Sequence, residues 1–446
     1  MSSLRFLRSL SVFVFILGCL FAVSKVQAQG AKQAVPNTRI PDSDADHIRE
    51  RAQWFFRGRL VAGKPSAELR RRANQAKLRM RAQRAAAQAF AHSMAQAVTS
   101  VPWTPLGPVP LASDATGNGT QDYHQVAGRA TAVAIDPADP TGNTVYIGGA
   151  QAGIWKSTNA AASSANGVIW TPLTDDQATL SIGAIAIQPG NSNPASSVIL
   201  AASGEANNSA DSYFGLGILR SADAGNTWTM ISTANGGNLS FSGLGGTRLA
   251  FSTVTNSTVV AAMATSSEGL IDGAISASTT RGLYTSLDAG QTWTYNSLTD
   301  PGGATDATSA TSVVYNASAA LFFAAIRYHG FYSSPDGVTW TRLSTQPGGS
   351  VLSTTACPPQ STSNGQACPI YRGEITVVPG RNEMYAWYIY LSSGSPVDGG
   401  IWQSLNGGAS WNPISDSAIA NCGDVEGCGV DIDLGRGART IVFGGI

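Results

Sequence analysis

The chain has 446 residues, of which 13% are charged and 49 are glycine, and its formal net charge is zero. After residue 100, small, β-branched and turn-forming residues predominate, which argues against a helical or βαβ protein and favours many short strands. The zero balance conceals an asymmetry, because residues 39–84 contain thirteen Lys and Arg against five Asp and Glu, whereas residues 101–446 contain eleven against 23.

The first 28 residues have the pattern of a secretory signal peptide. Arg5 and Arg8 precede an apolar run from Leu10 to Val23, and Val26-Gln27-Ala28 offers a cleavage site with small residues. The apolar run is too short to predict a membrane span. We therefore expect export after cleavage to a secreted, periplasmic or cell-surface location, with no stable membrane span and no nucleic-acid partner.

Residues 29–100 form a basic segment with a helical pattern. Gly63-Lys64-Pro65 interrupts this pattern, and Ser66 is placed to cap a second helix with small and apolar residues on one side and arginines on the other. We interpret the segment as a linker or a clasp that packs on the following domain. A basic helix on a membrane surface is the alternative, but the alanine-rich apolar side is weak for that purpose.

A short motif, which we call the box, recurs along the rest of the chain. Its copies are SADAGNTW at 221–228, SLDAGQTW at 286–293, SPDGVTW at 334–340, SLNGGASW at 404–411 and a looser copy from Ser157 to Trp170. Five copies cannot all be one active site, so the repeat indicates a structural device.

Each box belongs to a unit with a constant order of segments. An apolar run, a turn, a second apolar run and a variable loop precede a third run and the box, whose tryptophan leads into a short outer strand. Four strands per unit, repeated along the chain, predict an all-β protein with the β-propeller fold. We place this domain at residues 101–446, with units near 127–173, 181–231, 246–296, 311–343 and 372–414.

Part of a sixth blade is expected from the two ends of this domain. Trp103 lies in a WTPL sequence identical to that at 170–173, and GVDIDL (429–434) and TIVFGGI (440–446) match the first two strands of a unit. We expect the propeller to be incomplete at its C-terminus. The alternative is a ring that the strand of Trp103 closes alone.

The boxes resemble the Asp-box repeats, also called bacterial neuraminidase repeats, of sialidases, sortilin-type receptors and xyloglucanase-type glycosidases, over roughly residues 101–446. In that family the box is a hairpin between the third and fourth strands of a blade. The Asp can accept hydrogen bonds from turn N–H groups, the Gly supplies a positive φ and the Trp packs between blades. A structural role is therefore assigned to Ser221, Asp223, Gly225, Trp228, Ser286, Asp288, Gly290, Trp293, Ser334, Asp336, Trp340, Ser404, Asn406 and Trp411.

The loops after the second and fourth strands of each unit are expected on the face opposite the boxes, and this face is where function is expected. Acidic and aromatic side chains there suit carbohydrate binding, and paired carboxylates suit glycoside hydrolysis. The catalytic candidates are Glu205 and Asp211, which share one loop. The binding candidates are Tyr213, Glu268, Asp272, Arg327, His329, Asp398 and His124, and the same loops hold Arg129, Arg281 and Tyr328.

Four cysteines form two sequence-local pairs, which predicts the disulfides Cys357–Cys368 and Cys422–Cys428 in an oxidising compartment. Zinc is the rival interpretation, but no His lies near these cysteines and their spacings match no common finger. No cofactor or metal site is predicted, although Ca²⁺ ligation by the loop carboxylates is an alternative.

The leading hypothesis for function is a secreted binding module that recognises a polysaccharide or an extracellular protein. The alternative is a glycoside hydrolase of sialidase-like or xyloglucanase-like type that uses loop carboxylates. No Arg-Ile-Pro sequence of the sialidase kind occurs, and propellers host many unrelated functions, so the resemblance does not choose between the two.

Overall fold

The structure is a computed structural model that describes residues 66–93, 111–112, 125–126, 128–164, 167–206, 212–266, 269, 274–300, 303–304, 308–358 and 368–414. Its one described α-helix of more than one turn is α3 (Ser66–Ser93), which begins where the Gly-Lys-Pro break ends. No helix in these ranges is long and apolar enough to cross a membrane.

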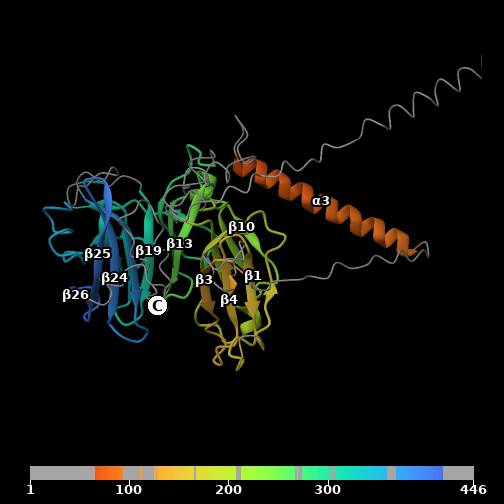
Figure 1. Ribbon diagram of the computed structural model, residues 1–446, viewed down its shortest axis with the longest axis horizontal. Helices are drawn as coiled ribbons and strands as arrows, with labels where there is room; N and C mark the ends of the chain where they lie inside the picture. The colour runs from red at the N-terminus through yellow and green to blue at the C-terminus, as the bar shows by residue number, and fades with distance from the viewer. Residues whose placement is uncertain are drawn as a thin grey trace, which may run out of the picture. The chain divides into compact units, whose positions relative to one another are not determined.

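Five four-stranded antiparallel sheets make up most of the described chain, and we call them blades 1 to 5 (Figure 1). Blade 1 comprises β3 (Ala130–Ile135), β4 (Val145–Gly149), β5 (Gly153–Ser157) and β6 (Thr171–Pro172). Blade 2 comprises β7 (Ile182–Ile187), β8 (Ile199–Ser203), β9 (Ile218–Ser221) and β10 (Thr229–Ile231). Blade 3 comprises β13 (Leu244–Phe251), β14 (Val259–Thr265), β15 (Gly282–Ser286) and β16 (Thr294–Tyr295).

Blade 4 comprises β19 (Ala310–Asn316), β20 (Leu321–Ile326), β21 (Gly330–Ser334) and β22 (Thr341–Arg342). Blade 5 comprises β23 (Ile370–Val377), β24 (Met384–Ser392), β25 (Ser395–Ser404) and β26 (Asn412–Ile414). Three two-stranded sheets pair β1 (Leu111–Ala112) with β2 (Gln125–Val126), β11 (Thr233–Ala234) with β12 (Leu239–Ser240), and β17 (Thr299–Asp300) with β18 (Gly303–Ala304). Short 3₁₀ turns are η3 (Pro194–Ser196) and η4 (Asn235–Gly237).

The first strand of each blade is the inner one. β3 contacts β7, β7 contacts β13, β13 contacts β19 and β19 contacts β23, so consecutive blades meet at their first strands. Within every blade the strands follow in sequence order, and the fourth strand is at the outer edge. This arrangement is a β-propeller, and it confirms the predicted fold class and the five predicted units. The segments expected to form the sixth blade lie outside the described residues.

A β-bulge recurs near the start of the inner strands, and in blades 1, 3 and 4 its threonine links the blade to the next. Pairing shifts at Thr131 in β3, Thr247 in β13 and Thr311 in β19. The Thr247 hydroxyl lies 3.0 Å from Ala262 O in its own blade and 3.1 Å from Ala310 O in the following blade. The hydroxyls of the other two threonines make equivalent pairs of contacts. Each hydroxyl therefore fastens one inner strand to its neighbour.

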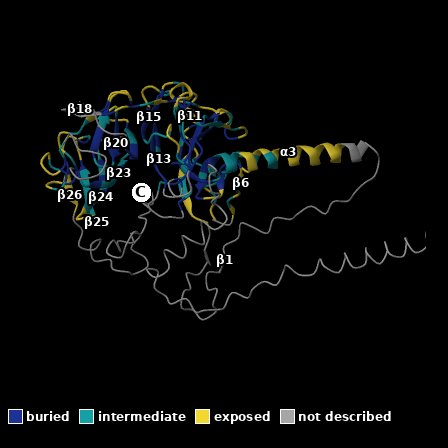
Figure 2. Ribbon diagram, turned by 90° about the horizontal axis from the view of Figure 1, so that it is seen from above, coloured by how far each residue is buried: buried dark blue, intermediate teal, exposed yellow. Residues whose placement is uncertain are grey.

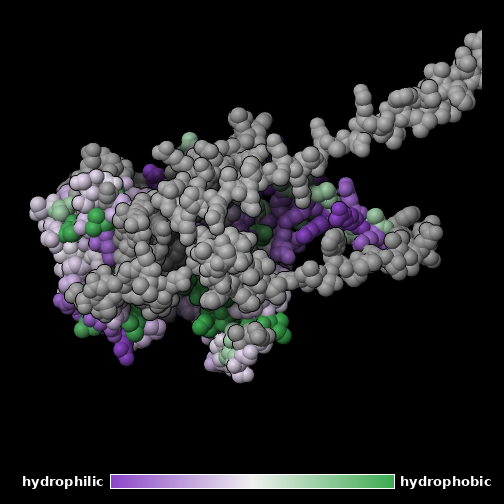
Figure 3. Space-filling view, in the orientation of Figure 1, coloured by the Kyte–Doolittle hydropathy of each residue, from purple (hydrophilic) through white to green (hydrophobic). Residues whose placement is uncertain are grey.

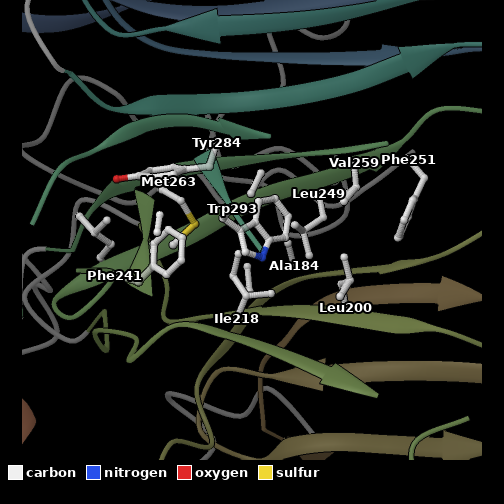
Figure 4. Packing of buried hydrophobic residues seen from close by; sticks show 14 of the residues in the cluster. Ala184, Leu200, Ile218, Phe241, Leu249, Phe251, Val259, Met263, Tyr284 and Trp293 are labelled. Carbon is white, nitrogen blue, oxygen red and sulfur yellow. The ribbon is translucent and has the colours of Figure 1, made fainter. Parts of the chain in front are cut away.

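Packing between blades forms the core, and four of the box tryptophans, Trp228, Trp293, Trp340 and Trp411, pack in its clusters. Trp293 is 2% exposed and lies in one cluster with Leu200 and Ile218 of blade 2 and with Val259 of its own blade (Figure 4). In Figure 2 the strands are mostly buried, whereas the turns at the rim are exposed. The wedge position expected for the tryptophan is therefore seen at this interface.

The boxes form turns between the third and fourth strands. In blade 3, Asp288 Oδ1 accepts from the backbone N–H groups of Gln291 and Thr292 at 2.9 Å, and Oδ2 accepts from Thr292 Oγ1 at 2.6 Å. Gly290 has a φ of 83° and lies against Leu200, where a Cβ would be 2.5 Å from its side chain. In the box of blade 5, the neutral side chain of Asn406 makes the equivalent contacts. These residues hold the backbone of a turn.

The first half of α3 packs on loops of blades 1 to 3. Ala67 is buried with Phe214, and the Arg70 guanidinium lies 3.8 Å from the centre of the Phe214 ring. Arg71 bonds to the Ser242 hydroxyl. Residues 78–89 are exposed, as Figure 2 shows along α3, and Figure 3 shows hydrophilic side chains along the helix. These contacts agree with the clasp interpretation for the part of the segment that the structure describes.

Candidate functional site

The loops that join second to third strands and those that join blades lie at one end of the blades, and the boxes lie at the other. This follows from the antiparallel order of every sheet. Arg129, Glu205, Arg281, Arg327 and Tyr371 all lie at or next to strand ends on the loop face. This face is therefore the candidate site.

A buried ion pair joins blades 1 and 2 on this face. Arg129, which directly precedes β3, donates from Nη2 to both oxygens of Glu205 at 2.9 and 2.8 Å and from Nε to Oε1 at 3.1 Å. The Glu205 side chain is 1% exposed and that of Arg129 is 37% exposed. A carboxylate held by a bidentate arginine is stabilised in its charged form and shielded from solvent. Glu205, the first catalytic candidate, therefore forms a contact between blades 1 and 2.

An arginine and two tyrosines meet at the junction of blades 4 and 5. The guanidinium of Arg327 lies 4.2 Å from the centre of the Tyr371 ring, and its Nε donates to Tyr371 O at 3.0 Å. The Tyr328 ring packs edge-on against Tyr371 with centroids 6.2 Å apart. Tyr328 has a φ of 66°, a left-handed conformation that is rare for a bulky residue and is often found at functional sites.

Further arginines surround this stack. Arg372 Nη2 lies 3.2 Å from Glu374 Oε1, and Arg248 Nε of blade 3 lies 3.5 Å from Glu374 Oε2. Arg281 Nη1 donates to Thr265 Oγ1 at 3.1 Å. We call Arg248, Arg281, Arg327 and Arg372 with Tyr328 and Tyr371 the arginine–tyrosine cluster.

The charges of this cluster act on one another. Burial lowers the pKa of the Arg327 guanidinium, Tyr371 and Tyr328 act to raise it, and Arg372 and Arg281 lower it further. Burial also raises the pKa of the Tyr328 hydroxyl, against the effect of Arg327. Arginine stays charged at neutral pH. Side chains from blades 3, 4 and 5 therefore share one electrostatic environment.

The sequence analysis expected Asp398 on a loop, but the structure places it on a strand. It is part of β25, because β24 and β25 extend past an irregularity in their pairing at Ile389 and end in a tight turn at Ser393 and Gly394. Its Oδ1 accepts from Trp387 Nε1 at 2.6 Å and from Gly400 N at 2.9 Å. Asp398 therefore orients Trp387 on the sheet of blade 5.

His329 is also placed differently from the expectation. Its side chain is fully buried, so it is not an exposed binding residue. The left-handed turn at Tyr328 directs His329 toward the core, where its carbonyl accepts from Arg342 Nε at 2.7 Å. Cys357 and Cys368 form the expected disulfide next to this turn, in the connection between blades 4 and 5. Arg342 also donates to Cys357 O.

Several candidates from the sequence lie outside the described residues, namely Asp211, Glu268, Asp272, His124, Cys422 and Cys428. Tyr213 is described, and its carbonyl accepts from Glu205 N at 2.8 Å, which closes the base of that loop. Within the described ranges, no group of three His, Cys, Asp or Glu residues is arranged to hold a metal ion.

Sequence reasoning missed Glu374 and Arg248, because they lie in runs interpreted as inner strands, and it missed Tyr371 and Arg372, which directly precede the run at 373–379. One signal was available. Counted from the strand positions opposite the box serines, Glu374 stands where Ser312 stands in blade 4 and where Arg248 stands in blade 3. Charged residues in blades 3 and 5 at a position that holds Ala132, Ala184 and Ser312 in the other blades indicate a special environment.

No family model and no curated protein matches the chain. Among solved structures it is similar to an ancestral GH74 enzyme, with 19% identity and a TM-score of 0.46 over 71% of this chain and 32% of that chain. It is also similar to the extracellular domain of a hybrid two-component system from B. thetaiotaomicron (12% identity, TM-score 0.35, 65% of this chain and 34% of that chain). A third similar structure is YCF48 bound to D1 peptide (11% identity, TM-score 0.27, 64% and 80%). The chain spans about a third of the length of the first two proteins.

Proposed function

We propose that the chain is an exported binding propeller of the Asp-box type, which recognises a polysaccharide or an extracellular protein on its loop face. The observation that supports this most is the engagement of Glu205 by Arg129. A general acid or base must reach the proton that it transfers, and a carboxylate that is 1% exposed inside a bidentate ion pair is poorly placed for that task.

The rest of the loop face suits recognition. Arginine forks donate several hydrogen bonds in a fixed plane, and tyrosine rings offer flat apolar surface with a polar tip. Arg327, Tyr328 and Tyr371 combine both properties at one place. Such combinations are typical of binding surfaces in which a few large side chains supply most of the affinity.

The test is a glycan-array screen for binding beside a screen for hydrolysis on the same glycans. We expect binding without release of reducing sugar, and unchanged hydrolysis background in a Glu205→Gln, Asp211→Asn double variant. Turnover by the parent protein that this variant abolishes, while binding persists, would instead identify a glycoside hydrolase. N-terminal sequencing of exported protein tests the cleavage after Ala28.

A further inference from the structure

We infer that the ligand of the loop face is an acidic polysaccharide, whose anionic groups bind at the arginine–tyrosine cluster. This inference rests on the proposed binding function and specifies its ligand class. The first observation is the charge of the cluster. Among the described residues, two of its four arginines, Arg248 and Arg372, pair with Glu374, and Arg281 and Arg327 bring two further positive charges to the same place.

That charge is exceptional for this domain. Residues 101–446 contain eleven Lys and Arg against 23 Asp and Glu, and four of those eleven belong to the cluster. Arginines scattered on an acidic domain would be expected to pair with its many carboxylates. Their collection at one site, with contributions from three blades, indicates selection of an anionic group.

The hydrogen bonds of the cluster leave donors for a ligand. Among the described residues, Arg327 has Tyr371 O as the acceptor for Nε, and its two terminal nitrogens bond to no protein group. Arg281 uses Nη1 on the Thr265 hydroxyl and pairs with no carboxylate in the same ranges. Guanidinium groups of this kind bind carboxylate or sulfate oxygens in a bidentate manner.

The tyrosines specify a sugar rather than a free ion. Tyr328 and Tyr371 place two rings beside the donors, and Arg327 is held flat against one of them. A small inorganic anion needs no apolar surface, whereas a sugar ring has an apolar face that packs on aromatic side chains. The strained backbone of Tyr328 is consistent with selection for the position of its ring.

The experiment measures binding of the full chain to three polymers by isothermal titration calorimetry. Polygalacturonic acid supplies carboxylates, dextran sulfate supplies sulfates and dextran is the uncharged control. We expect binding to an acidic polymer, weakened by added salt because screening reduces the attraction, and no binding to dextran. The relative affinities of the two acidic polymers show which anionic group the site prefers.

Arg327→Met should weaken acidic-polymer binding on the order of tenfold or more, because arginine anchors often dominate binding. Arg381→Met is the matched control, since Arg381 lies on the opposite face with a side chain that is 70% exposed. If Arg327→Met lowers the melting temperature, Arg281→Met replaces it, because Arg281 makes fewer contacts. Binding that both cluster variants leave unchanged would overturn the inference.

The outcomes also separate this inference from the proposed function. Equal binding of dextran and the acidic polymers, insensitive to salt, would overturn the anionic ligand and leave the polysaccharide-binding function standing. Binding of none of the glycans on the array by the folded protein would overturn both the inference and the polysaccharide form of the proposal.

Discussion

Replacing Arg129 by methionine should destabilise the propeller, because Glu205 would keep its buried charge and lose the guanidinium that spans both of its oxygens. Breaking a buried ion pair from one side costs about 3–5 kcal/mol. The Arg129 side chain is 37% exposed, and solvent screens the pair to that extent. We therefore expect a loss of about 2 kcal/mol in the free energy of unfolding, at the lower end of the range for a hydrogen-bonded charge.

The measurement is urea unfolding at pH 7, followed by tryptophan fluorescence. Glu205→Gln combined with Arg129→Met removes both charges, and it should recover part of the loss because no carboxylate charge remains buried at this place. Arg381→Met, on the exposed side of the opposite face, should change stability little. A change of less than about 0.5 kcal/mol for Arg129→Met would refute the reasoning. The ion pair between Arg129 and Glu205 would then contribute little to stability.

Three further results are expected. First, the pKa of Asp288 is lowered by its hydrogen bonds with Thr292, even though burial acts to raise it, so its contribution to stability is complete above about pH 4 and is lost as pH falls through the folded-state pKa. The melting temperature should therefore fall as the pH drops below about 4, and less steeply in Asp288→Asn, because Asn406 shows in blade 5 that an amide can hold the same turn; equal slopes would contradict this. Second, Trp293→Ala should cost about 3–5 kcal/mol in urea unfolding, and a cost below about 1 kcal/mol would show that the blade interface tolerates the loss. Third, Cys357→Ser should remove about 2–3 kcal/mol, matched by chemical reduction of the parent protein, because the disulfide closes a loop with a sequence separation of 11; free thiols in the parent would disprove it.

The fold could be predicted because each box is specified by contacts between residues that are close in the sequence. A box specifies its turn through side chains only a few residues apart, such as Asp288 and Thr292, so the pattern survives in the sequence whatever surrounds it. The position of the box then sets the third and fourth strands, and the apolar runs before it set the first two. The α3 helix was likewise predicted from its spacing and its break.

The site was predicted only in part, because it depends on contacts between distant segments. Arg327 and Tyr328 were found as loop residues, but their partner Tyr371 is 44 residues from Arg327 along the chain. The burial of His329 follows from the left-handed backbone conformation of Tyr328, which the pattern of side chains in the sequence does not predict. Asp398 was misplaced because its segment contains turn-forming residues that the structure uses in an extended strand.

The threonine hydroxyls at the inner strands also define how the molecule could be divided. The hydroxyl of Thr311 contacts both Ala325 O in its own blade and Gly373 O in the next. A cut between sequence repeats keeps Thr311 with Ala325 O and separates it from Gly373 O, whereas a cut in the turn between the first and second strands separates it from both carbonyls. Modules for circular permutation or for transplanting blades should therefore begin and end between sequence repeats, where a cut breaks one of the two contacts rather than both.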